Sequence, residues 1–290
     1  MKLTVTSYSF EQYIKAGKLT QLTAIAAAKE IGLGAIEFTD LTPPEGVSKA
    51  DYARELRAEA DRLGMEISSY TIGANLFQAT PEAEAAEIER LKKQVDIAEI
   101  LGTKNMRHDV VWALSKTGAG RSFDLMLPTL AKNAREITEY AASKGIRTCS
   151  ENHGYIAQDS DRMERLVNAV NHDNYGLLVD MGNFACADED SAIAVSRVAP
   201  YAVYVHAKDF IKRTFYEGPI PAGSFQTRGC NYLRGVAVGT GDIPVKQCLA
   251  ILKRAGYDGY VSIEYEGRED CIDGVKTAFA NLTKFLEELA

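Results

Sequence analysis

Short runs of β-branched and aromatic residues alternate with longer amphipathic stretches along the whole chain. The short runs are typical of β-strands, and the longer stretches carry apolar residues at helical spacing. We predict strands over residues 3–8, 35–38, 65–70, 103–107, 146–150, 175–179, 202–205 and 260–263. We predict helices over residues 19–31, 48–63, 81–101, 122–143, 159–170, 187–198, 243–255 and 275–289. Strict alternation predicts a parallel sheet, and eight repeats predict that this sheet closes into a barrel.

The length of the chain is compatible with a single domain. A chain of 290 residues suggests about two domains of roughly 150 residues each, but α/β barrels of roughly 250 residues form one. No linker-like change in composition interrupts the alternation. We therefore predict an α/β protein in which residues 1–290 form one (β/α)8 TIM barrel. A doubly wound open sheet is the alternative, which the absence of a glycine-rich fingerprint after the first strand disfavours.

One connection is much longer than the others. The stretch over residues 210–241 follows the seventh predicted strand, whereas connections of about 2–6 residues are typical. It contains Pro219, Pro221, several glycines and the aromatic residues Phe215 and Tyr216. We predict a long irregular loop that acts as an active-site lid. A surface excursion or an oligomer arm is the alternative.

Charge and cysteine usage exclude several classes of protein. The formal net charge of −7 argues against a nucleic-acid or anionic-membrane partner, because phosphate binding requires a basic face. The five scattered cysteines never form a C-x-x-C pair, which indicates reduced thiols in a cytosolic protein. No apolar run approaches the roughly 20 residues of a membrane span. We expect a soluble cytoplasmic protein with no membrane partner, and the sequence leaves homo-oligomer formation open.

Four predicted strands end at a residue that can bind a metal. Glu151, Asp180, His206 and Glu264 close strands five to eight, and the carboxyl ends of barrel strands converge on one mouth. A single carboxylate at a strand end is more often a loop cap than a ligand, but four such residues in register favour a metal site. Three oxygen donors and one nitrogen donor suit manganese best, with magnesium or cobalt as substitutes, and they are compatible with zinc or iron.

Six short motifs lie in the half of the chain that contains these residues. They are SENHG (150–154), VDMGN (179–183), VHAKD (205–209), GTGD (239–242), GYDG (256–259) and SIE (262–264). Together they resemble the xylose isomerase-like TIM-barrel superfamily, and most of all its sugar phosphate isomerase/epimerase branch, which includes ketose 3-epimerases and inosose dehydratase. The resemblance is densest over residues 146–267.

The resemblance implies an enzyme that moves protons beside a carbonyl group. The glutamates that match Glu151 and Glu264 bind the metal and act as acid and base on opposite faces of a substrate carbon. Lewis-acid stabilisation is worth several kcal/mol, and a positioned base typically adds 10²–10⁴-fold. The implied function is therefore a divalent-metal-dependent isomerase or epimerase acting on a keto-sugar or polyol ketone, a small-molecule substrate.

The sequence departs from the ketose epimerases at two positions. Asn183 stands where those enzymes commonly carry a histidine, and Lys212 stands where they often place a substrate-binding arginine. Asparagine cannot donate a proton near neutral pH. The departures favour a metal-dependent lyase acting on 3-keto sugars as the alternative, similar to inosose dehydratase or to C-glycoside deglycosidases. A non-catalytic sugar-binding barrel is the alternative of another class.

Other polar residues near the predicted mouth are candidates for binding substrate. Glu37 ends the second strand, His108 follows the fourth, His153 follows Glu151 by two positions, and Lys208 follows His206 by two. Residues two apart on a strand share a face, so Lys208 is expected to point to the same mouth as His206. With Asn183 and Lys212, these residues complete the predicted substrate-binding set. For each of them, ordering a loop or ordinary packing is the alternative role.

Overall fold

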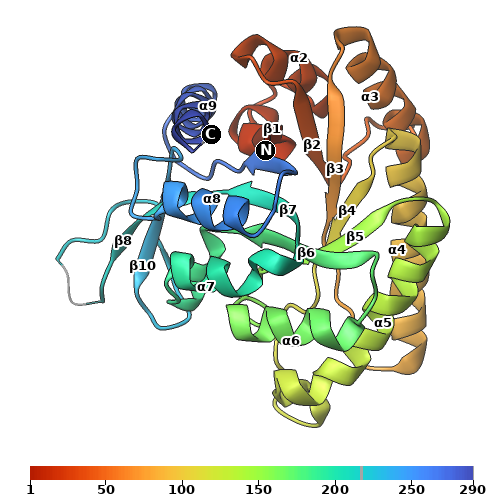
Figure 1. The fold of residues 1–290 in the computed structure, drawn as a ribbon. Helices are drawn as coiled ribbons and strands as arrows, with labels where there is room; N and C mark the ends of the chain where they lie inside the picture. Colours follow the sequence, from red (N-terminus) through yellow and green to blue (C-terminus); the bar gives the residue numbers. More distant parts are fainter. Residues whose placement is uncertain (216–217, 290) are drawn as a thin grey trace.

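A computed structural model describes residues 1–215 and 218–289 (Figure 1). Eight parallel strands within them close into a barrel in which β1 (Lys2–Thr6) lies between β2 (Ala35–Thr39) and β11 (Tyr260–Ile263). The other barrel strands are β3 (Glu66–Ile72), β4 (Asn105–His108), β5 (Arg147–Glu151), β6 (Tyr175–Asp180) and β7 (Ala202–Ala207). Lys2 pairs with Tyr260 and Val5 pairs with Ile263, so the first and last barrel strands join. The predicted (β/α)8 barrel is confirmed.

The larger helices lie around the outside of the barrel (Figure 1). They are α2 (Gln21–Ile31), α3 (Lys49–Leu63), α4 (Pro81–Leu101), α5 (Phe123–Ser143), α6 (Ser160–Val170), α7 (Ser191–Val198), α8 (Val245–Arg254) and α9 (Cys271–Glu288). A short helix, α1 (Glu11–Lys15), precedes them. Thr80 caps α4 by accepting a hydrogen bond from the backbone N–H of Ala83, and Gly102 ends it with φ 72°. Glycine adopts that left-handed conformation without steric cost.

Two predicted helix starts differ from the structure by four residues, and the others lie within two residues of it. Helix α7 begins at Ser191 instead of residue 187, because residues up to Ala187 form a 3₁₀ turn and Asp188 adopts a left-handed φ of 60°. Helix α9 begins at Cys271, four residues before the predicted start, because Asp270 accepts hydrogen bonds from the backbone N–H groups of Ile272 and Asp273. Asp190 caps the first turn of α7 by accepting a hydrogen bond from the backbone N–H of Ile193, as Asp270 caps that of α9.

The prediction of a long irregular loop after β7 is wrong, because part of this segment forms a β-sheet. The segment contains a three-stranded antiparallel sheet of β8 (Asp209–Arg213), β9 (Phe225–Gln226) and β10 (Tyr232–Val236), with β10 in the middle. The rings of Phe210 and Phe225 pack at 5.6 Å across this sheet. The small sheet projects beyond β7 in Figure 1. Tyr216, named as part of the predicted lid, lies outside the described residues.

The inward-facing residues of the barrel form the floor and the mouth of a site. Cys149, Leu178 and Tyr204 form a small buried cluster inside the barrel. Because side chains alternate faces along a strand, the residues two positions further along, Glu151 and His206 among them, also point inward, at the carboxyl end. Among the described residues, no helix is both long and apolar enough to span a membrane.

Candidate metal centre

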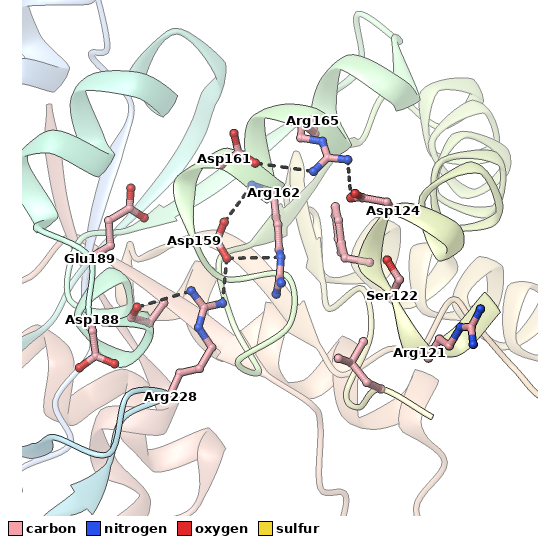
Figure 2. Close-up of a pocket in the computed structure, with 13 residues that line it drawn as sticks. Arg121, Ser122, Asp124, Asp159, Asp161, Arg162, Arg165, Asp188, Glu189 and Arg228 are labelled. Carbon is pink, nitrogen blue, oxygen red and sulfur yellow. Dashed lines mark hydrogen bonds and ion pairs between the residues drawn. The ribbon is translucent and has the colours of Figure 1, made fainter. Parts of the chain in front are cut away.

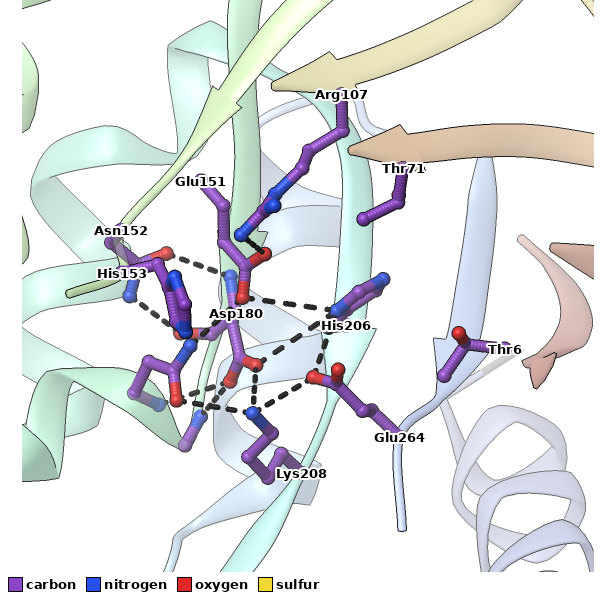
Figure 3. A network of polar contacts seen from close by, with 12 residues as sticks. Thr6, Thr71, Arg107, Glu151, Asn152, His153, Asp180, His206, Lys208 and Glu264 are labelled. Carbon is purple, nitrogen blue, oxygen red and sulfur yellow. Dashed lines mark hydrogen bonds and ion pairs between the residues drawn. The ribbon is translucent and has the colours of Figure 1, made fainter. Parts of the chain in front are cut away.

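The four predicted ligands meet at the mouth of the barrel. Glu151 ends β5, Asp180 ends β6, His206 lies in β7, and Glu264 directly follows β11. Strand register places Asp180 opposite His206 and His206 opposite Ser262. One donor atom from each of the four residues lies within 4.8 Å of the others. Figure 3 shows the four side chains converging from their separate strands.

The His206 imidazole is held by carboxylates on both ring nitrogens. Its Nδ1 lies 3.0 Å from Oε2 of Glu264 and 3.9 Å from the carboxylates of Glu151 and Asp180. Its Nε2 lies 2.9 Å and 3.1 Å from the two carboxylate oxygens of Glu37, across the barrel on β2. Burial opposes protonation, but the flanking carboxylates of Glu37 and Glu264 raise the pKa of His206 well above its usual value. The nitrogen that faces the cluster is therefore Nδ1.

Glu37 lies inside the barrel, beneath the cluster. Its side chain is fully buried and also accepts a hydrogen bond from Thr71 Oγ1. Burial raises the pKa of Glu37, but His206 outweighs this and holds it below the usual range. We predicted Glu37 as a substrate ligand, whereas in the structure its carboxylate contacts His206.

One oxygen of Asp180 is available to a cation. Oδ1 accepts hydrogen bonds from the backbone N–H groups of Gly182 (2.8 Å) and Asn183 (2.9 Å). Oδ2 is buried and has no hydrogen-bond partner among the described residues, although Lys208 Nζ lies 3.2 Å away. A buried carboxylate oxygen without a partner is costly. An oxygen-rich donor set around it suits a hard or borderline divalent ion, so the residues present fit a bound metal.

The carboxylates of the cluster also repel one another. Burial raises the pKa of Asp180 to about 7, with Lys208 opposing the shift and Glu264 and Glu151 reinforcing it. Such crowding is relieved by a cation. In the structure Lys208 supplies that charge, with Nζ 2.8 Å from Glu264 and 3.5 Å from Glu266. Its side chain is buried, and these carboxylates, with Asp180 the largest influence among them, outweigh burial and raise its pKa well above the usual value.

Arg107 and Asn183 hold Glu151 from two sides. The guanidinium of Arg107 lies 2.5 Å from Glu151 Oε2 and 2.8 Å from Asp109 Oδ1. The amide nitrogen of Asn183 donates to Glu151 Oε1 at 2.8 Å, and its amide oxygen accepts from Lys208 at 3.2 Å. Both carboxylate oxygens of Glu151 are therefore positioned by neighbouring side chains.

The structure separates His108 from this cluster. Arg107 pairs with Cys149, which faces the barrel interior, so the next residue, His108, faces outward. The imidazole of His108 is buried, its Nδ1 donates to the carbonyl of Asp109 at 2.8 Å, and its ring lies 6.3 Å from that of Tyr175. We predicted His108 and missed Arg107 as a site residue. Alternation along the fourth strand implies that only one of the two faces the mouth, and the register with β5 decides that it is Arg107.

A cavity of about 510 Å³ opens above the cluster. The polar residues of its wall include His153, Gln158, Asn183, Lys208 and Glu266, and its aromatic residues are Tyr8, Trp112, Tyr155 and Phe225. Asn183 and Lys208 belong both to this wall and to the cluster beneath it. These two residues therefore connect the cavity to the cluster, whose four donor residues do not themselves line it. Sequence reasoning missed Tyr8 and Glu266, although Tyr8 ends the first predicted strand and Glu266 lies three residues after the last one.

His153 and Lys212 have different surroundings. His153 Nδ1 lies 2.9 Å from Asp109 on the cavity wall, and this hydrogen bond outweighs burial and raises the pKa of His153. Lys212 lies on β8 and lines a separate cavity with Asp188 and Asp190. Its backbone N–H donates to Asp242 at 2.7 Å. The structure thus brings four of the six predicted substrate-binding residues to the cluster or its cavity, and it places His108 and Lys212 apart from them.

A second, larger cavity of about 690 Å³ lies beside the site and is lined mainly by charged residues (Figure 2). Its charges are largely paired with one another. Arg228 lies 2.8 Å from Asp159, and Arg165 pairs with Asp124. Arg228 comes from the turn between β9 and β10, whereas Asp159 caps α6, so the ion pair ties the small sheet to the loop after β5. We assign this cavity no ligand.

Comparison with known proteins gives a consistent match. The family model described as Xylose isomerase-like TIM barrel matches residues 25–289. Inosose dehydratase of Clostridium perfringens is 25% identical over 139 residues, 48% of this chain, and the chain spans only 46% of that protein's length. L-ribulose-5-phosphate 3-epimerase UlaE of Salmonella heidelberg is 23% identical over 274 residues, covering 88% of this chain and 85% of that protein.

Solved structures show the same architecture. The IolI protein, whose structure contains a zinc atom, matches with a TM-score of 0.76 and 16% identity, covering 100% of this chain and 99% of that one. D-psicose 3-epimerase of Clostridium cellulolyticum, solved with D-tagatose, matches with a TM-score of 0.75 and 17% identity, covering the same shares. At these identities the likeness establishes the fold alone.

Proposed function

The chain belongs to the xylose isomerase-like TIM barrel family, and from this premise we propose that it is a divalent-metal-dependent sugar isomerase or epimerase. The substrate would be a keto-sugar or a polyol ketone. Relatives that are epimerases and a dehydratase support an enzyme in general. The observation that carries the proposal is the convergence of four donor atoms within 4.8 Å beneath a cavity.

In this proposal Glu151, Asp180, His206 and Glu264 hold the ion. When bound, the ion supplies Lewis acidity that favours an enediolate, worth several kcal/mol. Glu37 orients the imidazole of His206 through its Nε2, and Lys208 offsets the charge of the cluster. Gln158, His153 and Asn183 offer hydrogen bonds to substrate hydroxyls from the cavity wall.

Glu151 and Glu264 are suited to act on opposite faces of one carbon. Their strands, β5 and β11, are separated in the barrel by β6 and β7, so the two carboxylates flank the cluster from different sides. One removes a proton beside the carbonyl, and the other returns a proton from the opposite face. Arg107 and Asn183 fix the first carboxylate, and His206 and Lys208 fix the second. A base positioned in this way typically contributes 10²–10⁴-fold.

A lyase acting on a 3-keto sugar is the second candidate. Asn183 favours it, because the amide that contacts Glu151 and Lys208 cannot act as a proton-donating acid as a histidine could. The same proton abstraction would then be followed by loss of a neighbouring hydroxyl or aglycone. A non-catalytic sugar-binding barrel is less favoured, since all four predicted ligands are present.

Proton exchange tests the proposal. Candidate ketoses are incubated in deuterated water with the manganese-loaded protein, and incorporation of deuterium beside the carbonyl is measured. Glu151→Gln and Glu264→Gln should each lower the exchange rate by at least about 10², whereas Glu287→Gln, at an exposed position of α9, should not change it. Product analysis then separates epimerisation, in which mass is retained, from elimination. If no keto-sugar shows exchange while metal is bound, both the isomerase/epimerase hypothesis and the lyase hypothesis would be rejected.

Several finer expectations are part of the same proposal. We propose manganese as the resident metal, and metal analysis of the purified protein tests it against the zinc seen in the IolI structure. We also propose a cytoplasmic location, with no nucleic-acid or membrane partner, and a single domain over residues 1–290. Pairing of β1 with β11 supports the last point, because it joins the two ends of the chain in one sheet.

A further inference from the structure

The residues around the cluster and its cavity carry an excess of negative charge. Six carboxylates lie around the cluster and its cavity. They belong to Glu37, Asp109, Glu151, Asp180, Glu264 and Glu266. Among the described residues in contact with them inside the barrel mouth, Arg107 and Lys208 are the permanent cations. With His206 neutral, as a metal ligand must be, four negative charges are in excess, and a bound divalent ion would leave two.

Neither cation is available to an incoming anion. Arg107 lies 2.5 Å from Glu151 and 2.8 Å from Asp109. Lys208 lies 2.8 Å from Glu264, and its side chain is only 4% exposed. Recognition of a phosphate requires cationic or backbone N–H donors with free valence. A phosphate group that bound Arg107 or Lys208 would have to displace buried carboxylates from these two cations.

The cavity wall above the cluster adds to this negative charge and is affected by it. Glu266 lines the cavity, and 25% of its side chain is exposed. Burial first, and then the charges of Glu266 and Glu264, raise the pKa of Tyr8 to about 12. The phenol of Tyr8 therefore stays neutral and can donate a hydrogen bond to a substrate oxygen.

The remainder of the wall is aromatic and partly open. Tyr8, Trp112 and Tyr155 are 38%, 48% and 40% exposed, and all three line the cavity. Aromatic rings offer apolar area to the C–H faces of a polyol ring, while a few placed polar groups orient it. Gln158 and Asn183 supply such groups, and neither carries a charge.

We propose that this cavity takes an uncharged, unphosphorylated keto-polyol and discriminates against sugar phosphates. The inference rests on the proposed function, because it places the substrate above the same cluster. It would distinguish this chain from the relative whose name specifies a 5-phosphate, L-ribulose-5-phosphate 3-epimerase UlaE. The physical reason is that a dianion enters an acidic site in which the buried cations Arg107 and Lys208 are both already paired with carboxylates.

Matched pairs of ligands test the inference. L-ribulose and L-ribulose 5-phosphate, and D-tagatose and D-tagatose 6-phosphate, are titrated into the manganese-loaded protein by calorimetry, with scyllo-inosose as a cyclic ketone. The free ketone of a pair should bind at least roughly tenfold more tightly than its phosphate. Equal or tighter binding of the phosphates would overturn the inference, and so would a metal-loaded protein that binds none of these ketones.

Deuterium incorporation with the same ligands separates this inference from the proposed function. Binding of the free ketones without any exchange would support the proposed substrate class and reject the catalytic proposal. Exchange that is faster with the phosphates would support the catalytic proposal and reject the proposed substrate class.

Charge reversal on the wall gives a second test. Glu266→Lys should shift the ratio of phosphate to free-ketone affinity by roughly tenfold toward the phosphate, and the milder Glu266→Gln should shift it less. Glu287→Lys makes the same charge change on exposed α9 and should leave the ratio unaltered. An unchanged ratio in both Glu266 variants, with folding and metal content intact, would contradict an electrostatic origin of the selectivity.

Discussion

Glu37 is the residue whose surroundings differ most from the prediction made for it. Its carboxylate receives His206 Nε2 at 2.9 Å and Thr71 Oγ1, and its side chain has no exposed surface. A carboxylate behind a metal-ligating histidine fixes the ring orientation and raises the basicity of the ligating nitrogen. Glu37 is therefore a positioning residue for the proposed metal site.

Removal of Glu37 should weaken metal binding. Glu37→Ala is expected to lower manganese affinity by about 10–100-fold, and Glu37→Gln, which keeps an acceptor but loses the charge, should have a smaller effect. Calorimetric titration of the metal-free protein measures both. The control is Glu30→Gln, at an exposed position of α2. Wild-type affinity in the alanine variant would show that Glu37 does not orient a ligand.

The raised pKa of Asp180 predicts how the stability of the metal-free protein changes with pH. The pKa of Asp180 is raised from 3.8 to about 7 in the folded protein, so the folded state binds more protons than the unfolded state between these values. The contribution of Asp180 to the stability of the metal-free protein therefore falls as pH rises from about 4 to about 7. Manganese affinity should rise over the upper part of this range, because a ligand carboxylate must be deprotonated.

The comparison with Asp180→Asn isolates this contribution. Chemical denaturation of both metal-free proteins at several pH values should show wild type losing stability relative to the variant as pH rises. A difference that is constant with pH would contradict the raised pKa.

At the scale of elements, the small antiparallel sheet is held over the cavity by a few polar contacts. Asp188 accepts hydrogen bonds from Thr227 Oγ1 (2.7 Å), Asn231 Nδ2 (2.9 Å) and the backbone N–H of Gly229. Tyr155 donates to the carbonyl of Gln226 at 2.9 Å. Since Phe225 lines the cavity, these contacts hold one part of its wall in place. The predicted role of this segment as a lid stays a prediction.

Loss of Asp188 should loosen this sheet without unfolding the barrel. Each hydrogen bond contributes about 0.5–1.5 kcal/mol net, so Asp188→Ala should favour local opening by about 2 kcal/mol. The amides of β9 and β10 should then exchange with solvent more than tenfold faster, while those of β5 and β6 should not change. Asp173→Ala, at an exposed position before β6, serves as the control. Faster exchange throughout the barrel would indicate global destabilisation instead.

At the scale of the whole molecule, the proposed site couples strands that are distant in sequence. Glu37 on β2, His206 on β7 and Glu264 after β11 are joined by contacts across the barrel. A ligand that binds only the folded state stabilises it by about 2.7 kcal/mol at a concentration 100 times its Kd. Removal of a bound divalent ion with a chelator should lower the Tm by several degrees.

Scanning calorimetry of the chelated and manganese-loaded protein measures this shift. Restoration by manganese but not by potassium would support a specific divalent site. An identical Tm with and without manganese would argue against binding to the folded barrel.

Much of the fold was predictable because its signals are local. Periodicity predicted the eight barrel strands, and the bounds of α4 agree with the prediction at both ends. The small sheet was not predicted, because β9 has two residues and its pairing with β10 depends on contacts across a turn. Short strands of this kind carry too few residues for a period to appear.

The sequence by itself determined the repeating strand and helix pattern and the four donors at the ends of strands five to eight. Both follow from properties within a few residues of each position. Only the tertiary structure decided that Arg107 faces the cluster and His108 does not, that Glu37 contacts His206, and that Lys212 lies apart. These outcomes depend on the register and closure of the barrel, which bring residues 169 positions apart into contact, and no local pattern encodes such a distance.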